Sequence, residues 1–453
     1  MRFNFKNMLQ KNKLRIIPLG GLGEIGRNMT VFEYGQDIVI IDMGLQFPEE
    51  DMPGIDYIIP NIDYLKGKEK NIKGVFITHG HYDHIGAIPH LMPKLGNPPL
   101  YGSALTAGII QKRQEDYPQS RIKVNVVDYD SRVNLGTFKV EFFHVNHNIP
   151  GVLGIVLHTP EGIVVHTGDF KFDHSPVADK PADIGRIAQI GTKNVLALMS
   201  DSTAAEVPGY SVSESEIQKV LDDIFVKAEG RIIVATFSSL ISRIQQIITL
   251  SEKYGRKLAI DGFSMRNNVE IAHQLGYLKI KKGTLIKADQ MKNSPDNKVA
   301  LMCTGAQGEE KAVLMRIVNK EHKFVNIKKG DSVIFSSSVV PGNERTVQNL
   351  KDQLYRQEAH VIHYKMMDVH AGGHGQVEDL KMMLNLIKPK FFIPVHGEYK
   401  HLVKNANIAK SMGIPPKNII ISDIGKVIET DGVEMRFGGT VPAGRVMVDG
   451  LGV

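Results

Sequence analysis

Three histidines and one aspartate stand within six residues of this chain, in the segment Thr78-His79-Gly80-His81-Tyr82-Asp83-His84. Imidazole nitrogens and carboxylate oxygens suit zinc and related divalent ions. Side chains of an extended segment alternate between two faces, so His79 and His81 can share one face while Asp83 and His84 turn toward a second point. The spacing therefore favours a metal site over the alternative, a surface loop that happens to be rich in histidine.

This segment follows an apolar run, residues 74–77, that is typical of a short buried strand. Four side chains in one loop cannot complete two metal shells, so further ligands must come from elsewhere. Three other apolar runs end in polar, ligand-type residues, in the segments 140–148, 163–169 and 391–398. Because sites in α/β proteins collect where strands end, we expect these segments to converge on the histidine-rich loop.

The same constellation resembles the metallo-β-lactamase superfamily, and within it the nucleic-acid-cutting β-CASP branch and the ribonuclease J family. The stretches that carry the resemblance include residues 15–21, 42–49, 167–172, 200–203 and 394–399, and the likeness runs through essentially all 453 residues in order. It implies an α/β fold, in which a metallo-β-lactamase αββα sandwich is interrupted by an inserted α/β β-CASP domain.

The resemblance also implies two divalent ions per chain, zinc or manganese, as cofactors. The expected ligands are His79, His81 and His147 for the first ion and Asp83, His84 and His396 for the second, with Asp169 bridging both. Two further histidines, His144 and His166, are expected to pack or face solvent. His166 lies three residues before Asp169 along a strand and should point to the opposite face, and His144 stands where the family carries a basic residue.

Catalytic roles follow from the same resemblance. His374, in the glycine-containing segment 370–375, is the expected general acid for the departing 3′ oxygen, and Asp201 is expected to orient it. Asp83 is assigned as both ligand and catalytic group. A polar loop with incidental histidines is the alternative, but the two glycines between His370 and His374 would let the backbone approach a phosphate closely.

A pocket for a 5′-terminal phosphate is expected at the end of a buried strand, where a helix begins and backbone N–H groups favour an anion. The residues expected to form it are Ser238, Ser239, Leu240, His370, Ala371, Gly372, Gly373 and His374. Simple helix capping by the two serines is the alternative. Gly372, Ala306 and Asn148 stand where the family usually carries serine, which leaves the fine geometry of 5′-end recognition open.

The positions of the ligands predict the domain organisation. Six of the seven lie before residue 170 and the seventh is His396, and strands alternate with helices in the block between them, which indicates a mostly parallel sheet. We assign residues 1–206 and 363–453 to two parts of the metallo-β-lactamase domain and residues 207–362 to the β-CASP domain. The family usually continues into a small C-terminal domain that helps pair subunits. We expect it to be absent, and the homodimer or tetramer of the family to be weakened.

One motif points to a different chemistry. Gly21-Leu22-Gly23-Glu24-Ile25-Gly26 fits the G-x-G-x-x-G pattern of dinucleotide-binding loops, which requires a helix next. The following runs, residues 29–34 and 38–42, are instead rich in strand-forming residues around a glycine-containing turn, which predicts a hairpin. The glycines are expected to allow a tight loop beside the metal site.

Composition agrees with a large globular enzyme. With 453 residues the chain exceeds one ordinary core, and its single cysteine, Cys303, excludes an internal disulfide and any cysteine-based zinc site and favours the cytoplasm. Neither a signal peptide nor a membrane span is visible, so no membrane partner is expected. The formal charge of +6 is compatible with a polyanionic substrate but is weak evidence by itself.

Three functions are therefore compared. The first is a metal-dependent ribonuclease of RNA maturation and decay that acts on single-stranded RNA from 5′-monophosphate ends and internally. The second, a β-CASP nuclease acting on DNA, is disfavoured only by the closeness of the whole-chain resemblance. The third, a small-molecule hydrolase such as a thioesterase or lactamase, would not need the long insert. A non-catalytic RNA-binding role is disfavoured because no expected metal ligand is missing.

Overall fold

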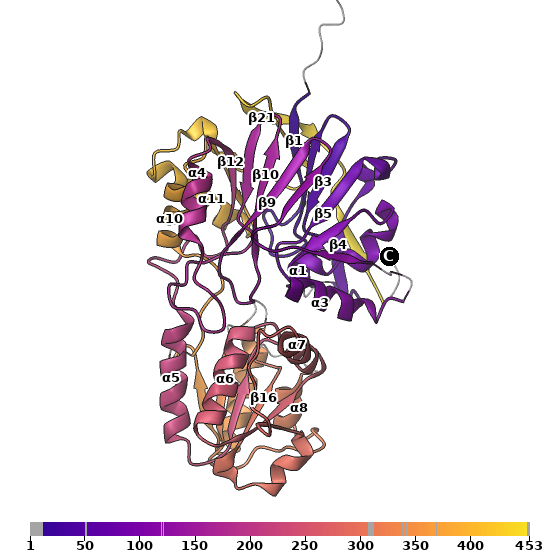
Figure 1. Cartoon of the computed structure of the whole chain (residues 1–453). Helices are drawn as coiled ribbons and strands as arrows, with labels where there is room; N and C mark the ends of the chain where they lie inside the picture. Colours follow the sequence, from indigo (N-terminus) through magenta and orange to yellow (C-terminus); the bar gives the residue numbers. More distant parts are fainter. Residues whose placement is uncertain are drawn as a thin grey trace, which may run out of the picture.

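The structure is a computed structural model that describes residues 12–49, 52–118, 120, 122–306, 312–337, 339, 343–367 and 369–450. The molecule has two lobes, one formed by the two ends of the chain and one by its middle (Figure 1). No helix in these described ranges has both the length and the apolar character needed to cross a membrane.

The first lobe is built on an eight-stranded sheet of order β21-β20-β1-β2-β3-β5-β6-β7. Its strands are β21 (Met435–Thr440), β20 (Lys426–Thr430), β1 (Leu14–Gly20), β2 (Met29–Tyr34), β3 (Asp37–Ile41), β5 (Ile72–Phe76), β6 (Leu100–Gly102) and β7 (Val124–Val126). Strands β2 and β3 pair antiparallel, with Thr30 opposite Ile41. The predicted hairpin after the glycine motif is confirmed, so the motif does not open a dinucleotide-binding helix.

A second sheet of six strands faces the first in the order β19-β12-β11-β10-β9-β8. Its strands are β19 (Phe391–Val395), β12 (Val195–Asp201), β11 (Gly162–His166), β10 (Leu153–Thr159), β9 (Phe138–His144) and β8 (Arg132–Leu135). Buried side chains from both sheets form one core, in which the rings of Phe76 and Phe142 lie 5.9 Å apart. Burial of apolar surface of this kind contributes about 25 cal/mol per Å² and holds the sheets face to face.

Helices cover the outer faces of these sheets (Figure 1). The first sheet is flanked by α1 (Tyr82–Ile85), α2 (Ile88–Leu91) and α3 (Ala104–Gln114), and the second by α4 (Ile184–Gly191), α10 (Val377–Ile387) and α11 (Tyr399–Ser411). The expected αββα sandwich is therefore confirmed. A separate pair of strands, β4 (Tyr57–Pro60) and β22 (Arg445–Val448), joins the last described part of the chain to this lobe.

The second lobe contains a six-stranded sheet of order β15-β14-β16-β13-β17-β18 in which every pairing is parallel, as predicted. Its strands are β13 (Ile232–Ala235), β14 (Lys257–Asp261), β15 (Leu285–Ile286), β16 (Val299–Cys303), β17 (Ser332–Phe335) and β18 (His360–His363). Its helices are α5 (Glu214–Lys227), α6 (Ile241–Lys253), α7 (Phe263–Gln274), α8 (Val313–Val318) and α9 (Glu344–Arg356). The predicted domain boundary at residue 362 falls within β18.

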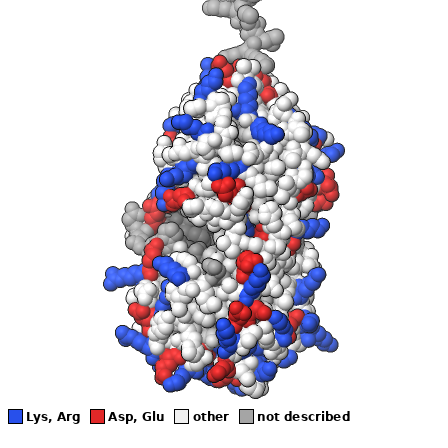
Figure 2. All heavy atoms as spheres, turned by 90° about the vertical axis from the view of Figure 1, so that its left-hand side faces the viewer, with Lys and Arg blue, Asp and Glu red and all other residues white. Residues whose placement is uncertain are grey.

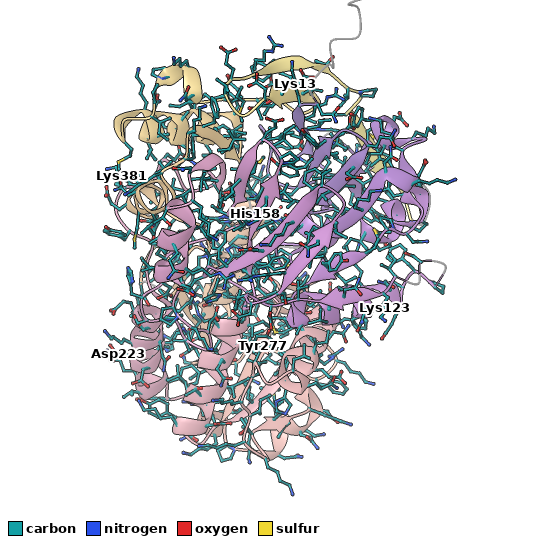
Figure 3. The ribbon with its side chains drawn as sticks, turned by 45° about the horizontal axis from the view of Figure 1, so that its top comes forward. Lys13, Lys123, His158, Asp223, Tyr277 and Lys381 are labelled. Carbon is teal, nitrogen blue, oxygen red and sulfur yellow. The ribbon has the colours of Figure 1, made fainter. Side chains whose placement is uncertain are left out.

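The two lobes meet where α3 packs beside α7. Gly108 makes this approach possible, because a Cβ there would lie 2.7 Å from Cγ2 of Ile271. Tyr277, just after α7, lies near the same junction in Figure 3. The insert is thus packed directly against the first lobe as well as connected to it by the chain.

Arg243 of α6 joins the insert to the segment that returns to the first lobe. Its guanidinium is fully buried, pairs with Oε2 of Glu214 at 3.0 Å, and donates to the carbonyl of Val369 at 2.5 Å and to the hydroxyl of Ser336. Burial raises the pKa of Glu214, but the nearby guanidinium outweighs this and holds the pKa below its ordinary value.

Replacing this guanidinium should strongly destabilise the protein. Arg243→Met leaves Glu214 as a buried carboxylate without its partner, which typically costs about 3–5 kcal/mol. Arg266→Met, which removes the half-exposed partner of Asp261, should cost at most about 1 kcal/mol. Urea unfolding followed by circular dichroism and fluorescence compares the two. Equal midpoints for the two variants would contradict a stabilising role of the buried pair.

Candidate metal and active site

The predicted ligands converge at one edge of the sandwich, where several strands end. His79 and His81 follow β5, His147 follows β9, Asp169 follows β11 and His396 follows β19. Their donor atoms form two groups, each with all atoms within 4.8 Å of one another: His79, His81 and His147, and Asp83, His84, Asp169 and His396. The residues come together as the sequence predicted.

The first group consists of imidazoles whose nitrogens face a common point. Nδ1 of His81 lies 3.0 Å from Nε2 of His79 and 3.1 Å from Nε2 of His147. Nδ1 of His147 lies 2.6 Å from the carbonyl of Gly373, so it carries the proton and leaves Nε2 free as a donor to a metal. Burial lowers the pKa of His81 to about 4 and those of His79 and His147 well below their ordinary value. Neutral, converging imidazoles fit a zinc-type ion.

Asp169 belongs to the second group and also reaches the first. Its Oδ2 lies 3.3 Å from Nε2 of His84 and 3.8 Å from Nε2 of both His79 and His147, and its Oδ1 lies 3.1 Å from Nδ1 of His396. Burial raises its pKa, but His396 and His84 outweigh this and hold it well below the ordinary value, so it is ionised. A carboxylate between two sets of imidazoles fits a bridging ligand.

The second group has a carboxylate of its own. Oδ2 of Asp83 lies 3.4 Å from Nε2 of His84 and 3.8 Å from Nε2 of His396. The pKa of Asp83 is lowered despite burial, mainly by His84. Nδ1 of His396 is buried, and its contact with Oδ1 of Asp169 does not have the geometry of a hydrogen bond. Two ionised carboxylates and two imidazoles offer the oxygen and nitrogen ligands that zinc and manganese accept.

His374 stands beside both groups. Its Nδ1 lies 2.7 Å from Oδ2 of Asp201, a buried carboxylate at the end of β12, and its ring centroid lies 5.0 Å from that of His147. Burial lowers the pKa of His374, but Asp201, Asp169 and Asp83 outweigh it and raise the pKa to about 9. With Nδ1 held by Asp201, the protonated Nε2 is the nitrogen left to meet a substrate.

The two segments of the expected phosphate pocket lie next to each other. The ring of Phe237, which precedes Ser238, lies 6.2 Å from that of His370. The N-cap of α6 is Leu240 and no side chain caps this helix, so the alternative that the serines are caps is wrong. His370 is half-buried, its Nδ1 is buried and unpartnered among the described residues, and desolvation lowers its pKa to about 3. It is a neutral imidazole.

The room available for a side chain differs among the residues of the loop from Ala371 to His374. A Cβ at Gly372 would meet no atom of the described residues within 4 Å, whereas one at Gly373 would lie 2.6 Å from the side chains of Asn148 and His147. Ala371 is buried. Gly373 is thus required for the close approach of the loop to the first ligand group, and Gly372 borders open space.

Comparison with known proteins agrees with this arrangement. Family models match at residues 22–209 (metallo-beta-lactamase superfamily), 229–354 (Ribonuclease J, beta-CASP domain) and 342–421 (Zn-dependent metallo-hydrolase RNA specificity domain). The chain is 42% identical to Ribonuclease J of Synechocystis sp. and 43% identical to Ribonuclease J of Thermus thermophilus, in each case over 98% of this chain and over 70% and 78% of the relative. The chain belongs to the ribonuclease J family. It is a metal-dependent ribonuclease.

Other relatives extend the comparison. Ribonuclease J2 of Bacillus subtilis is 40% identical over 98% of this chain and 80% of its own length. A crystal structure of a protein of unknown function from Enterococcus faecalis superimposes with a TM-score of 0.66 at 16% identity, covering 92% of this chain and all of that one. This last likeness concerns the fold alone.

Asp42, a residue of the ribonuclease J site to which no role was assigned from the sequence, orients one ligand. It accepts hydrogen bonds from the backbone N–H of Thr78 at 2.8 Å and from Nδ1 of His84, also at 2.8 Å. Its φ of 62° is a left-handed conformation that costs energy for a non-glycine residue and is typical of functional sites. Like His79, His147 and His396, it follows a buried strand, here β3, and this position was the signal in the sequence that could have identified it.

The two histidines left out of the ligand set lie at different distances from it. Nε2 of His144 lies 2.9 Å from the carbonyl of Lys180, outside the ligand groups. His166 lines a small cavity with His84, Asp169 and His396, and its Nδ1 accepts the N–H of Gly168. The expectation that His166 points away from Asp169 is wrong, because β11 ends at His166 and Gly168 turns the chain with a φ of 59°.

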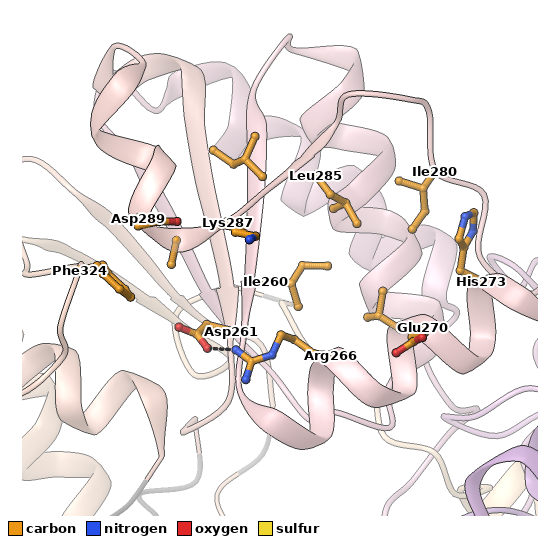
Figure 4. Close-up of a pocket in the computed structure, with 13 residues that line it drawn as sticks. Ile260, Asp261, Arg266, Glu270, His273, Ile280, Leu285, Lys287, Asp289 and Phe324 are labelled. Carbon is orange, nitrogen blue, oxygen red and sulfur yellow. Dashed lines mark hydrogen bonds and ion pairs between the residues drawn. The ribbon is translucent and has the colours of Figure 1, made fainter. Parts of the chain in front are cut away.

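Neither the charge distribution on the surface nor a cavity in the insert indicates an active site elsewhere in the described residues. Basic and acidic side chains are interspersed on the face shown in Figure 2, so the net charge of +6 does not locate the RNA there. A cavity of about 610 Å³ lies beside β14 and α7, with Asp261 already paired to Arg266 (Figure 4). It is mainly apolar, and we assign the chemistry to the ligand groups.

Proposed function

We propose that this enzyme hydrolyses RNA with two divalent ions, zinc or manganese, held by His79, His81 and His147 and by Asp83, His84 and His396, with Asp169 shared. The supporting observation is the convergence of seven donor residues into two groups in contact through one carboxylate. When bound, such a pair of ions supplies an activated water and withdraws charge from the phosphoryl oxygens.

The chain itself would supply the proton for the departing 3′ oxygen. His374 carries a proton that Asp201 stabilises at Nδ1, and its Nε2–H is then available to the leaving group. Asp201 holds the ring in one orientation, so the donor does not have to be ordered during the reaction. His374 therefore acts as general acid and Asp201 as its positioning residue.

We further propose entry from 5′ ends, in addition to internal cleavage. The wall formed by residues 237–240 and the loop 370–374 brings the start of α6, where the helix dipole favours an anion, together with the neutral ring of His370. Such a wall can hold a terminal phosphate next to the metals. Apart from the protonated ring of His374, the groups that line this wall are neutral, which suits a monophosphate better than the larger charge of a triphosphate.

The 5′ group should therefore control the exonucleolytic rate. We expect RNA with a 5′-monophosphate to be degraded faster than the same RNA with a 5′-triphosphate, and internal cleavage to be equal for both. Time courses with 3′-labelled and internally labelled RNA of one sequence separate the two activities. Equal exonucleolytic rates for the two RNAs, with both metal equivalents bound, would contradict the proposed 5′-phosphate pocket. The enzyme would then be an endonuclease that does not recognise the 5′ end.

Gly372 offers a direct test of the pocket. Because a Cβ there contacts none of the residues that the structure describes, Gly372→Ser should fold and bind metal normally, and its hydroxyl should strengthen the preference for 5′-monophosphate. Gly373→Ser is the matched comparison: its side chain would collide with His147, so metal content should fall. Metal analysis and the ratio of rates for the two RNAs measure both effects. An unchanged ratio in Gly372→Ser would place the terminal phosphate elsewhere.

RNA as the preferred substrate, over DNA, is tested by a single assay. Purified protein is incubated with 5′-labelled single-stranded RNA and DNA of equal sequence, with zinc or manganese and with chelator. We expect hydrolysis of RNA that chelator abolishes. Faster cleavage of DNA would favour the second candidate, a β-CASP DNA nuclease. We propose the cytoplasm, where RNA is matured and degraded, as the site of action.

A further inference from the structure

The glycine motif between β1 and β2 has no part in the function described so far, yet it touches the second ligand group. The backbone N–H of His396 donates to the carbonyl of Gly21 at 3.0 Å. Single β-bridges join Gly23 to Glu398 and Glu24 to Gly397. The motif therefore forms a short strand-like contact along the segment that carries His396.

The same loop reaches the other side of this group through its last residue. The backbone N–H of Asn28 donates to the carbonyl of Asp83 at 3.0 Å, and its side-chain Nδ2 donates to the same oxygen at 3.1 Å. Nδ2 also lies 3.2 Å from Nε2 of His84. One loop of nine residues, 20–28, thus contacts three of the four members of the second group: the backbones of His396 and Asp83 and the ring of His84.

A buried ion pair fixes the shape of this loop. Nε and Nη2 of Arg27 donate to the two carboxylate oxygens of Glu24, each at 2.9 Å, and both side chains are less than 10% exposed. Oε1 of Glu24 also accepts the N–H of Gly21. Such a two-pronged pair sets both distance and direction. Arg27 has a left-handed backbone, with a φ of 52°, so the ion pair occurs in a turn that the backbone alone does not favour.

The first ligand group is held by other elements. Nδ1 of His147 is bonded to Gly373, and Nδ1 of His79 lies 3.1 Å from the hydroxyl of Thr78. The contacts of loop 20–28 described above all reach the second group. A change in this loop should therefore act on one metal position and spare the other.

We propose that Glu24 and Arg27 are positioning residues for the second metal site: their ion pair holds loop 20–28 in the shape that sets His396 and Asp83 at coordination distance. This inference rests on the proposed two-metal function. It predicts a selective loss, in which one metal equivalent binds weakly and the other binds as in the native protein. Outer-shell changes of this kind typically reduce metal affinity by about 10- to 100-fold.

The test is a zinc titration of chelator-stripped full-length protein against a chromophoric competitor, with bound metal counted by elemental analysis. Glu24→Gln removes the charge and keeps the size. Arg27→Gly removes the guanidinium and leaves a residue that adopts the left-handed backbone freely. Asp331→Asn is the matched control, because it breaks an equally buried pair, with Arg231, in the insert. Arg27→Lys, which keeps the charge but not the two-pronged geometry, should give an intermediate affinity.

Measurement in a His81→Ala background, where only the second site is left intact, assigns the weakened equivalent. We expect Glu24→Gln and Arg27→Gly to weaken that single site by about 10-fold or more, and Asp331→Asn to leave it unchanged. Native affinity for both equivalents in both loop variants would overturn the inference alone. Equal weakening by Asp331→Asn would reduce the pair to a general stabilising contact and would also overturn it. A native protein that binds no metal would instead overturn the proposed function.

Discussion

Asp83→Ala should abolish RNA hydrolysis while leaving the fold intact, because Asp83 is a proposed ligand in the second group and sits at the start of α1, outside the apolar core. His81→Ala should act in the same way on the first group. Loss of one ion removes part of the charge compensation that the phosphoryl transition state requires, an effect worth several kcal/mol. Chelation of the native protein should give the same result, reversed by zinc or manganese.

Single-turnover cleavage rates, metal content and circular dichroism together check this outcome. His144→Ala is the control, since His144 is a buried histidine outside both groups, bonded to Lys180. It should retain metal and activity. Hydrolysis at the native rate by protein shown to contain no metal would contradict the assignment of both groups.

His374→Ala should separate proton transfer from metal binding. We expect native metal content and a rate reduced by about 10²- to 10⁴-fold, the usual contribution of a positioned general acid. Asp201→Asn should lower the rate in the same direction, because it replaces the carboxylate that stabilises the protonated ring at 2.7 Å.

An RNA with a good leaving group at the cleaved bond provides the diagnostic comparison. A 3′-bridging thiolate departs without protonation, so His374→Ala should cut it at nearly the native rate. An equal defect on both substrates would show that His374 does not donate the proton. Loss of metal in His374→Ala would instead make it a ligand, in the third possible group with His147 and Asp169.

The sandwich and the parallel sheet of the insert could be predicted because apolar runs and their order along the chain reflect burial directly. The run 74–77 corresponds to β5 and the run 391–395 to β19, and the ligands follow at the ends of these strands. Spacing separated only the pair His79 and His81 from the pair Asp83 and His84, and it did not divide all seven ligands between two ions. That division came from the resemblance to the family and agrees with the two groups in space.

Contacts made by turns could not be predicted. The orientation of His166 depends on where β11 ends and on the left-handed turn at Gly168. The alternation of side chains along a strand, on which the prediction relied, gives neither of these. The role of Asp42 depends on its own left-handed backbone. Glu24 and Arg27 are three residues apart, a spacing that suggests an ion pair on a helix, whereas here they pair across a turn.

The order in which the chain passes through the two lobes has a consequence for protein synthesis. Asp201 precedes the insert, whereas His374 and His396 follow it, so the hydrogen bond between Asp201 and His374 closes only after the insert has been made. On the proposed roles, a nascent chain that ends before residue 396 has neither a complete second metal site nor, before residue 374, a proton donor. A ribosome that translates this nuclease therefore carries no chain able to cut RNA until the segment up to His396 has been made.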